Sequence, residues 1–394
     1  MLPVQKYLQD ARYNLETLHR DYGIDYKVYP EENCVILTYS MIESPKDDPI
    51  VMDCRGLILR LDNPAFDILC KPFTRFFNWG ECPELQKGFD FSKAIIMEKV
   101  DGSLVSFWWN PVQNNWCCST RSMAFAEGKT TADISESFRE AILKAVGGTQ
   151  NEINQFFEFQ KGYTFTFEFT SPENRVVKNY GPEYKLTFLA CHNNETGEYM
   201  ENSFDHFMWL LDNAAERYPD NNAFRKIRFP KFYPLKDLQA VKEYIKKLEP
   251  TDEGFVCYDY LSKIRVKVKN PSYLEIASIR VNNGLTEKGI INMIFSDGID
   301  EYLSYFPEDA YLAQPYIDAW KKTLDEIKKA FEKVRDIPIS TPEERKAFAL
   351  SIKDSPYRGI LFEFKDGKFL DKILENMHFE PKRKLILQNL EKNC

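Results

Sequence analysis

The sequence predicts an α+β fold, in which a domain of antiparallel sheets and helices over residues 1–283 is followed by an all-helical domain over residues 284–394. Short β-rich runs bounded by turn residues recur from about residue 26 to residue 269. After Asn283 the apolar residues recur at helical spacing instead. A chain of 394 residues is also long enough for two domains.

The first domain is expected to begin with an amphipathic helix over residues 1–20, because Leu8, Leu15 and Leu18 stand among charged residues. A second helix is expected over residues 131–146, where Gly147 provides a stop signal. Strands are expected at residues 34–39, 55–61, 94–97, 104–109, 163–170, 185–191, 254–258 and 264–269.

The helical domain is marked by three signals. Pro315 is expected to open a long helix that carries Trp320 and further apolar residues at helical spacing. Residues 341–344, Thr-Pro-Glu-Glu, form a capping box with proline at the first helical position. A further apolar stripe runs over residues 369–377.

Composition narrows the class of protein. The formal net charge is −8, so any contact with nucleic acid has to come from a local basic patch. Basic residues cluster over residues 225–236 among aromatic ones, which suits either a base-stacking surface or a solvated connector. The nine cysteines show no Cys-x-x-Cys pair, and no secretory signal or membrane-length apolar run is evident, so a reduced, cytoplasmic protein is expected.

The sharpest local feature is Lys99-Val100-Asp101-Gly102-Ser103, which stands between two apolar strands. Asp-Gly is a strong hairpin-turn signal, so a surface hairpin is one interpretation. The other is a lysine fixed at the end of a strand and aimed at a phosphate in a cleft.

Three further pieces favour the second interpretation. Glu168 lies on the polar side of an aromatic strand, and Glu253 leads into another strand. In the last strand the basic residues of the 264–269 segment all face one way; they are Arg265, Lys267 and Lys269. Each piece alone would also suit a solvated strand.

Together the four pieces suit transfer of a nucleotide to lysine. A free lysine amine titrates near about 10.4, so only about one in a thousand is neutral at neutral pH. Nearby cations and partial burial lower that pKa, and Lys267 and Lys269 would supply the cations. The same two lysines would neutralise charge on the α-phosphate. Glu253 and Glu168 offer hard oxygen ligands for Mg²⁺ or a partner for a ribose hydroxyl.

This series of motifs resembles the covalent nucleotidyltransferases and, within them, the RNA ligase 1 family typified by bacteriophage T4. The resemblance covers about residues 25–283. Its motifs are Lys99–Ser103, Phe167–Val177, Asn194–Tyr199, Glu253–Val256 and Lys267–Lys269 with Tyr273 beyond, and upstream Thr38–Tyr39, Cys54–Gly56 and Arg75–Asn78.

The resemblance implies an ATP-dependent RNA ligase with an ATP-grasp-like adenylylation domain and with Lys99 as its nucleophile. It implies catalytic roles for Lys267, Lys269 and Glu253 as well. The residues implied to contact ATP are Tyr39, Arg55, Arg75, Glu98, Lys99, Arg121, Glu168, Lys267 and Lys269. Arg75 and Arg121 stand where the family more often has lysine, which alters the geometry of their donors.

Glu253 and Asp300 are the implied ligands of Mg²⁺, for which Mn²⁺ is the alternative. An acidic helix start is the competing interpretation of Asp300. The expected substrate is RNA with 5′-phosphate and 3′-hydroxyl ends, with nicked tRNA as a candidate and RNA repair as the setting. A monomer without membrane contact is expected, in the host cytoplasm if a phage encodes it.

Two other classes of function share parts of this pattern. An mRNA-capping guanylyltransferase or a DNA ligase usually carries an OB-fold after the fifth motif, whereas this chain continues into helical segments. A catalytically idle nucleotide- or RNA-binding module would not need all five of the residues Lys99, Glu168, Glu253, Lys267 and Lys269.

Overall fold

A computed structural model of the chain describes residues 1–129, 137–174, 176–278, 285–305 and 307–390. The chain divides into two compact units, Met1–Ala277 and Ser278–Cys394. The expected domain boundary at residues 283/284, the expected helix start at Thr131 and the motif residue Arg175 all lie outside the described residues.

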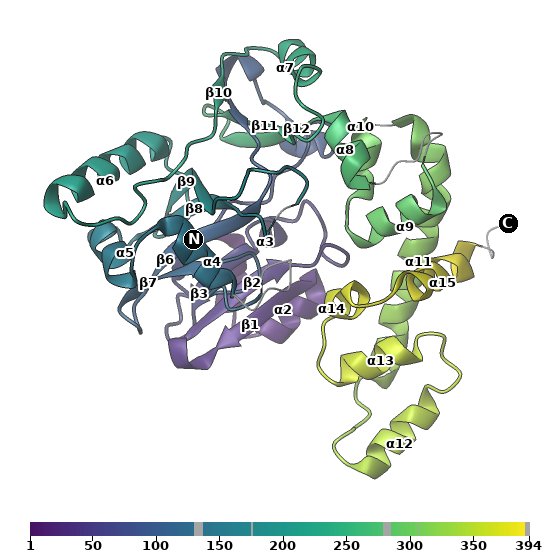
Figure 1. Cartoon of the computed structure of the whole chain (residues 1–394). Helices are drawn as coiled ribbons and strands as arrows, with labels where there is room; N and C mark the ends of the chain where they lie inside the picture. The colour runs from purple at the N-terminus through teal and green to yellow at the C-terminus, as the bar shows by residue number, and fades with distance from the viewer. Residues whose placement is uncertain (130–136, 175, 279–284, 306, 391–394) are drawn as a thin grey trace. The chain divides into compact units, whose positions relative to one another are not determined.

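Sheet A of the first unit is built from four strands in the order β1-β2-β3-β4, and the first three helices accompany it (Figure 1). Apolar side chains on one face, such as Leu37 and Leu57, pack with Leu18 of the second helix. The other face packs Ile36 and Ile58 against Trp108 of sheet C, so both faces of sheet A are buried. The bounds are β1 Ile24–Tyr29, β2 Cys34–Tyr39, β3 Arg55–Arg60, β4 Ile68–Cys70, α1 Pro3–Gln9, α2 Leu15–Tyr22 and α3 Pro49–Met52.

The N-terminal helix expected over residues 1–20 is two helices, α1 and α2. The chain leaves α1 at Asp10 and starts again because Asn14 caps α2, accepting a hydrogen bond from the Thr17 amide at 2.9 Å. The Asn-x-x-Thr sequence at residues 14–17 is the local signal for this second helix start.

Sheet C has the order β7-β6-β8-β9, and its aromatic face packs against helices α4 to α6. Phe165, Phe167 and Phe169 alternate along β8 as expected and lie in this core. Thr164 and Thr166 on the other face are fully buried as well, so β8 has no solvated face along most of its length. The bounds are β6 Ser103–Asn110, β7 Asn115–Ser119, β8 Tyr163–Thr170, β9 Lys185–Asn193, α4 Phe138–Val146, α5 Gln150–Phe156 and α6 Ser203–Arg217.

Sheet B has the order β10-β5-β11-β12, with α7 packed against one of its faces. Phe255, Val266 and Val268 turn toward α7 and form the core beneath it. Residues directly opposite each other in antiparallel strands share a face. Met97, Val256 and Lys267 are such cross-strand neighbours and therefore lie on the face away from α7. The bounds are β5 Ala94–Glu98, β10 Phe232–Tyr233, β11 Gly254–Asp259, β12 Ile264–Lys269, α7 Leu238–Ile245 and α8 Pro271–Ser278.

The second unit is helical throughout its described part (Figure 1). The long helix α11 packs against α15, where the Thr323 hydroxyl donates to the carbonyl of Leu385 at 2.9 Å. The ring of Trp320, in the same helix, packs against that of Phe295, with 4.5 Å between the ring centres. The bounds are α9 Glu287–Phe295, α10 Ile299–Tyr305, α11 Ala310–Val334, α12 Pro342–Ser351, α13 Arg358–Lys365, α14 Leu370–Glu375 and α15 Phe379–Leu390.

Pro315 does not open the long helix but lies inside it, because α11 already begins at Ala310. Proline removes one backbone donor, whose acceptor would be the carbonyl of Tyr311. Tyr311 is 75% exposed, so water can satisfy that carbonyl and the helix continues. The capping box at Thr341 is present as expected, with the Glu344 amide donating to its hydroxyl. In the described part of the chain, every helix is too short or too polar to traverse a bilayer.

Candidate active site

Lys99 lies on the connection between sheet B and sheet C. Strand β5 ends at Glu98 in sheet B, and β6 starts at Ser103 in sheet C, so residues 99–102 join two sheets and do not form a hairpin. The Lys99 amide donates to the carbonyl of Gly254 at 2.9 Å. A Cβ atom at Gly102 would lie 2.4 Å from the carbonyl oxygen of Phe169, which explains glycine at this position.

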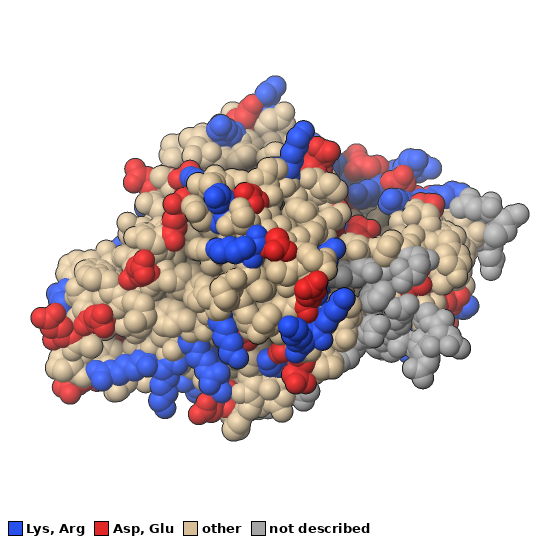
Figure 2. Space-filling view, turned by 90° about the horizontal axis from the view of Figure 1, so that it is seen from above, with Lys and Arg blue, Asp and Glu red and all other residues tan. Residues whose placement is uncertain are grey.

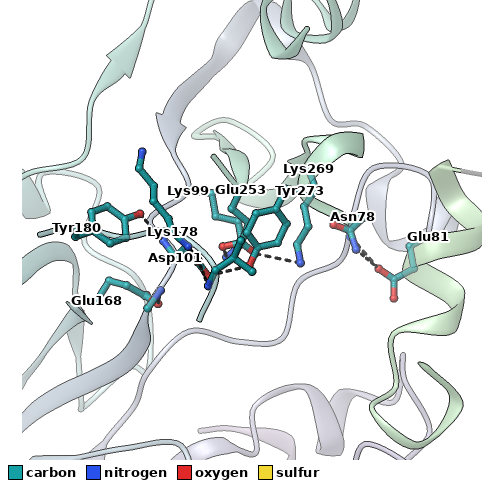
Figure 3. A network of polar contacts seen from close by, with 12 residues as sticks. Asn78, Glu81, Lys99, Asp101, Glu168, Lys178, Tyr180, Glu253, Lys269 and Tyr273 are labelled. Carbon is teal, nitrogen blue, oxygen red and sulfur yellow. Dashed lines mark hydrogen bonds and ion pairs between the residues drawn. The ribbon is translucent and has the colours of Figure 1, made fainter. Parts of the chain in front are cut away.

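Glu253 brings together Lys99, on the connection after β5, and Lys269, at the end of β12 (Figure 3). Its Oε2 lies 2.7 Å from Lys99 Nζ, and its Oε1 lies 3.0 Å from Lys269 Nζ. The next residue, Gly254, has φ +124°, and a Cβ atom there would lie 2.3 Å from the carbonyl oxygen of Val268. Only glycine fits this close approach, so the motif glycine fixes where Glu253 enters the site.

The charge state of Glu253 depends on these two ion pairs. Burial alone would raise the pKa of its carboxyl group, but the ammonium groups of Lys99 and Lys269 more than offset burial and hold that pKa below its ordinary value. Glu253 is therefore an anion at neutral pH.

The surroundings of Glu168 raise the pKa of its carboxyl group, whereas those of Glu253 lower it. Glu168 Oε1 accepts a hydrogen bond from the Gly102 amide at 3.1 Å. Burial raises the pKa of Glu168 to about 7, and the nearby carboxylate of Glu253 adds to the rise, although Lys99 and Arg55 oppose it. The sequence predicts that Glu168 is solvated, binds Mg²⁺ or binds a ribose hydroxyl, and these roles stay predictions. The ligand-free site holds its carboxyl group close to its titration point at neutral pH.

Replacement of Glu168 by glutamine should therefore change stability in a pH-dependent way. The pKa is higher in the folded chain than in the unfolded one, so the bound proton favours folding below about pH 4.5 and this contribution is lost as the pH rises through 7. We expect Glu168→Gln to match the wild type in unfolding free energy at pH 5 and to exceed it at pH 8 by on the order of 2 kcal/mol. Urea unfolding of the nucleotide-free protein at both pH values measures this difference, and equal gains at the two would contradict it.

Asp101 holds the Lys99 connection in place (Figure 3). Its Oδ2 accepts hydrogen bonds from the amides of Val177 and Lys178 at 2.9 and 2.8 Å, and its Oδ1 accepts one from the Tyr273 hydroxyl at 2.8 Å. The Asp101 amide donates to the Tyr180 hydroxyl at 2.9 Å. The sequence indicates no function for Asp101 beyond its place in a turn and in the Lys99–Ser103 motif. Its place two residues after Lys99 was the only local signal that it holds this connection.

These residues line a pocket of about 370 Å³, a size that suits a small-molecule ligand. Five of the nine residues expected to contact ATP line it, namely Arg55, Glu98, Lys99, Glu168 and Lys269, and so does Glu253, which was expected to bind the metal. Apolar side chains such as Leu104, Val256 and Phe76 make up much of the remaining wall.

The other expected site residues lie elsewhere. Lys267 lies on the pocket face of sheet B, 5.5 Å from the centre of the Phe76 ring. Arg75 and Arg121 lie over the ring of Tyr39, at 4.3 and 4.4 Å from its centre. Tyr39, Arg75 and Arg121 thus form a separate cluster, and none of the three lines the Lys99 pocket. Asp300 is in α10, in the second unit, so its expected metal-binding role stays a prediction.

Arg265, the third member of the cationic row, is enclosed by aromatic rings. Its guanidinium lies 4.5 Å from the ring centres of both Phe73 and Tyr258 and 4.7 Å from that of Tyr199. Such rings stabilise a cation that has lost much of its hydration. Arg265 also lines a second cavity, of about 300 Å³, which shares Phe76 with the first. It therefore forms part of the wall between the two cavities.

The described residues contain no group of three or more His, Cys, Asp or Glu side chains arranged to hold a metal ion. Magnesium usually keeps several waters and binds through one or two carboxylates together with substrate phosphates. Glu253 and Glu168 fit this second pattern, because both line the pocket and offer hard oxygen atoms.

Comparison with known proteins places the chain among ligases. A family model described as RNA ligase matches residues 53–273. The chain is 29% identical over 334 residues to a protein of Autographa californica nuclear polyhedrosis virus named "Putative bifunctional polynucleotide kinase/RNA ligase", a match covering 81% of the chain and 44% of that protein. The chain thus spans less than half the length of this relative.

Two further similarities extend along most of the chain. An RNA ligase of Rhodothermus phage RM378 is 22% identical over 393 residues, which cover 86% of the chain and 85% of the phage protein. Among solved structures, an archaeal ATP-dependent RNA ligase aligns with 90% of each chain, at 14% identity and a TM-score of 0.47.

Proposed function

The chain belongs to the RNA ligase family, in which its sequence resembles the RNA ligase 1 members typified by bacteriophage T4, and from this premise we propose that it is an ATP-dependent RNA ligase. The observation that carries the proposal is the convergence of Lys99, Glu253 and Lys269 in one pocket, with 2.7 and 3.0 Å between the ionic groups. A nucleophilic amine beside a phosphate-binding cation is what covalent transfer of AMP requires.

In the first step the Nζ atom of Lys99 attacks the α-phosphorus of ATP. A nitrogen–phosphorus bond forms, the bond to the β-phosphate oxygen breaks, and pyrophosphate leaves while the amine gives up a proton. Lys269 lies on the opposite side of Glu253 from Lys99 and would stabilise the charge on the α-phosphate, together with Lys267. Arg55, which lines the same pocket, would bind the outer phosphates.

In the second step an oxygen of an RNA 5′-phosphate attacks the same phosphorus, which releases Lys99 and gives an adenylylated RNA end. In the third step the 3′-hydroxyl of another end attacks the 5′-phosphorus, a phosphodiester bond forms, and AMP leaves. Glu168 would hold the ribose of the adenosine during these steps, because it lies in the pocket wall next to the Lys99 connection.

Magnesium, or manganese in its place, would be held by Glu253 with oxygens of the phosphates and with water. When bound, such an ion orients the pyrophosphate leaving group. The Glu253 carboxylate lies 2.7 Å from Lys99 Nζ, so this site would be next to the nucleophile.

Incubation with ATP or GTP labelled in the α-phosphate, followed by a denaturing gel, tests the proposal. Label retained from ATP with Mg²⁺, and sealing of a 5′-phosphorylated RNA, are the expected results. Label from GTP alone would indicate a capping guanylyltransferase, and sealing of DNA in preference to RNA would indicate a DNA ligase. No label from either nucleotide would contradict the proposal.

We further propose that residues 284–394 form a separate helical domain that recognises the RNA, for which nicked tRNA is the candidate. A chain ended after Asn283 should stay soluble and keep most of its lysyl-AMP formation, because all the pocket residues precede that point. Sealing of a structured RNA should fall by at least tenfold. Gel-based assays of both activities measure this, and loss of lysyl-AMP formation would mean that Asp300 or its neighbours take part in the first step.

We propose a monomer that acts on RNA 5′-phosphate and 3′-hydroxyl ends in the cytoplasm, in RNA repair. Relatives from a virus and a phage support this setting, which for a phage protein would be the host cytoplasm.

A further inference from the structure

The segment formed by residues 225–233, here called the basic crossover, joins the two sheets that enclose the Lys99 pocket. At Arg228 it pairs with sheet C, where the Arg228 amide donates to the Leu186 carbonyl at 3.0 Å. At Lys231 it reaches sheet B, where the Lys231 carbonyl accepts from the Glu98 amide at 2.8 Å. Pro230, between these two points, lines the pocket. The basic crossover therefore passes along the wall of the candidate active site.

The charge of this segment contrasts with that of the whole chain. Residues 225–233 include four basic residues and no acidic one, although the chain has a formal net charge of −8. On the face shown in Figure 2, by comparison, basic and acidic side chains are interspersed. A segment next to the pocket that carries basic residues and no acidic one therefore differs from the rest of the chain.

Some residues of this segment have a structural function and are not available to bind a ligand. The Arg225 guanidinium donates to the carbonyls of Asn221 and Pro219, so it holds the backbone. Phe224 and Phe229 pack in the core of sheet C, so these two aromatic residues do not form the base-stacking surface that the sequence offered as one interpretation.

Three basic side chains remain at the surface. Lys226, Arg228 and Lys231 are exposed, and none of their side chains makes an ion pair or hydrogen bond to another described residue. Two carboxylates lie near this segment: that of Glu98, which accepts a hydrogen bond from the Lys231 amide at 3.4 Å, and that of Glu183, which is already paired with Lys185 at 2.9 Å. The pKa of Glu183 is lowered by Lys185 first and then by Arg228 and Lys226, which places it within their electrostatic reach. Three exposed cations without an ion pair among the described residues thus lie on either side of Pro230, which is part of the pocket wall.

An exposed aromatic ring continues the same surface. Phe232 is 50% exposed and lies directly opposite Met97 in the pairing of β10 with β5. Cross-strand partners share a face, and Met97 lines the pocket, so Phe232 lies on the pocket side of sheet B. One edge of its ring is supported by Phe204, at 5.1 Å between ring centres. Cations along a backbone path with an aromatic ring at one end are the features that bind a single strand of nucleic acid.

We propose that the basic crossover binds the sugar–phosphate backbone of the RNA strand whose reacting end enters the Lys99 pocket, with Lys226, Arg228 and Lys231 at successive phosphates and Phe232 under a base. This inference rests on the proposed function, because it assigns the approach of the RNA to the same pocket. Backbone contacts of this kind carry little sequence preference and depend strongly on salt.

The test compares two triple variants of the full chain. K226A/R228A/K231A removes the three exposed cations, and K242A/K246A/K247A removes three exposed lysines on or next to α7, which covers the other face of sheet B. Binding of a 5′-phosphorylated single-stranded RNA is followed by fluorescence anisotropy at several salt concentrations. Formation of lysyl-AMP from labelled ATP is measured in parallel, because that step needs no RNA.

We expect the crossover variant to bind RNA at least tenfold more weakly than the wild type at low salt. The slope of log affinity against log salt should fall by about two, at about 0.7 for each lost phosphate contact. The α7 variant should bind within threefold of the wild type, and both should form lysyl-AMP at wild-type yield. Phe232→Ala should weaken binding about tenfold without changing the salt slope.

The possible failures are distinct. If the wild type forms no lysyl-AMP, the proposed function itself fails. If the wild type forms lysyl-AMP and binds RNA, but the crossover variant binds and responds to salt like the α7 variant, the basic crossover is a solvated connector and the inference is overturned.

Discussion

Replacement of Lys99 by alanine is expected to abolish formation of the covalent AMP adduct while leaving the fold intact. Lys99 is the lysine whose amine lies in the pocket within 2.7 Å of the Glu253 carboxylate, so its loss removes the attacking atom. Glu253 keeps its second partner, Lys269, at 3.0 Å, so the variant does not leave this buried carboxylate without a counter-ion. Intact-protein mass spectrometry after incubation with ATP measures the adduct directly.

Two controls make this result specific. Lys93→Ala changes an exposed lysine next to the opposite end of the same strand, β5, and should form the adduct like the wild type. A pre-adenylylated RNA bypasses the first step, so Lys99→Ala should retain part of its sealing activity with that substrate. Equal and complete loss of both activities would indicate that Lys99 has a structural function and is not the nucleophile.

The second large effect is expected at the two lysines of β12. Lys267→Ala and Lys269→Ala should each slow adduct formation by about 2–4 kcal/mol in activation free energy, because each removes a cation that stabilises charge in the transition state. This corresponds to roughly 30- to 1000-fold in rate. Single-turnover labelling with saturating ATP measures the chemical step.

The structure also indicates which of the two variants should lose more rate. Lys269 lines the pocket and contacts Glu253, whereas Lys267 lies beside Phe76 on the same sheet face. Lys269→Ala should therefore be the slower of the two, and Lys269→Arg should recover part of its loss. A rate within threefold of the wild type for either alanine variant would assign that lysine to an ordinary strand surface.

Alternation along single strands was the part of the site that the sequence predicted well. Arg265, Lys267 and Lys269 do share one face of β12, because the side-chain period of a strand is two and Val266 and Val268 are needed in the core under α7. The pattern alone, however, could not distinguish a phosphate-facing cation from one enclosed by aromatic rings. Arg265 is enclosed by the rings of Phe73, Tyr199 and Tyr258. Two of these residues, Phe73 and Tyr199, are distant from it in the sequence, so the pattern of β12 carries no signal of them.

The local sequence pattern could not predict which strands belong to the same sheet or which distant segments meet at the site. The Asp-Gly sequence after Lys99 suits a hairpin, and nothing within the motif shows that β5 and β6 belong to different sheets. The same holds for Asp101, whose acceptor oxygens are occupied by Val177, Lys178 and Tyr273. The resemblance to a family groups Tyr39, Arg75 and Arg121 with the ATP contacts. In the structure both arginines lie over the Tyr39 ring, and their contacts with ATP stay a prediction.

The strand order of sheet B has a consequence for synthesis of the protein on the ribosome. Strand β5, which ends next to Lys99, pairs only with β10 and β11 in the described sheet, and Glu253 lies 154 residues after Lys99. A nascent chain that has exposed β5 therefore lacks both neighbours of this strand until residues 232–259 have emerged. At the usual pace of translation, about 5–20 residues per second, this interval lasts roughly 10–30 seconds. The candidate nucleophile therefore cannot be charged with AMP during this interval, and an unpaired apolar strand needs protection from other chains for that time.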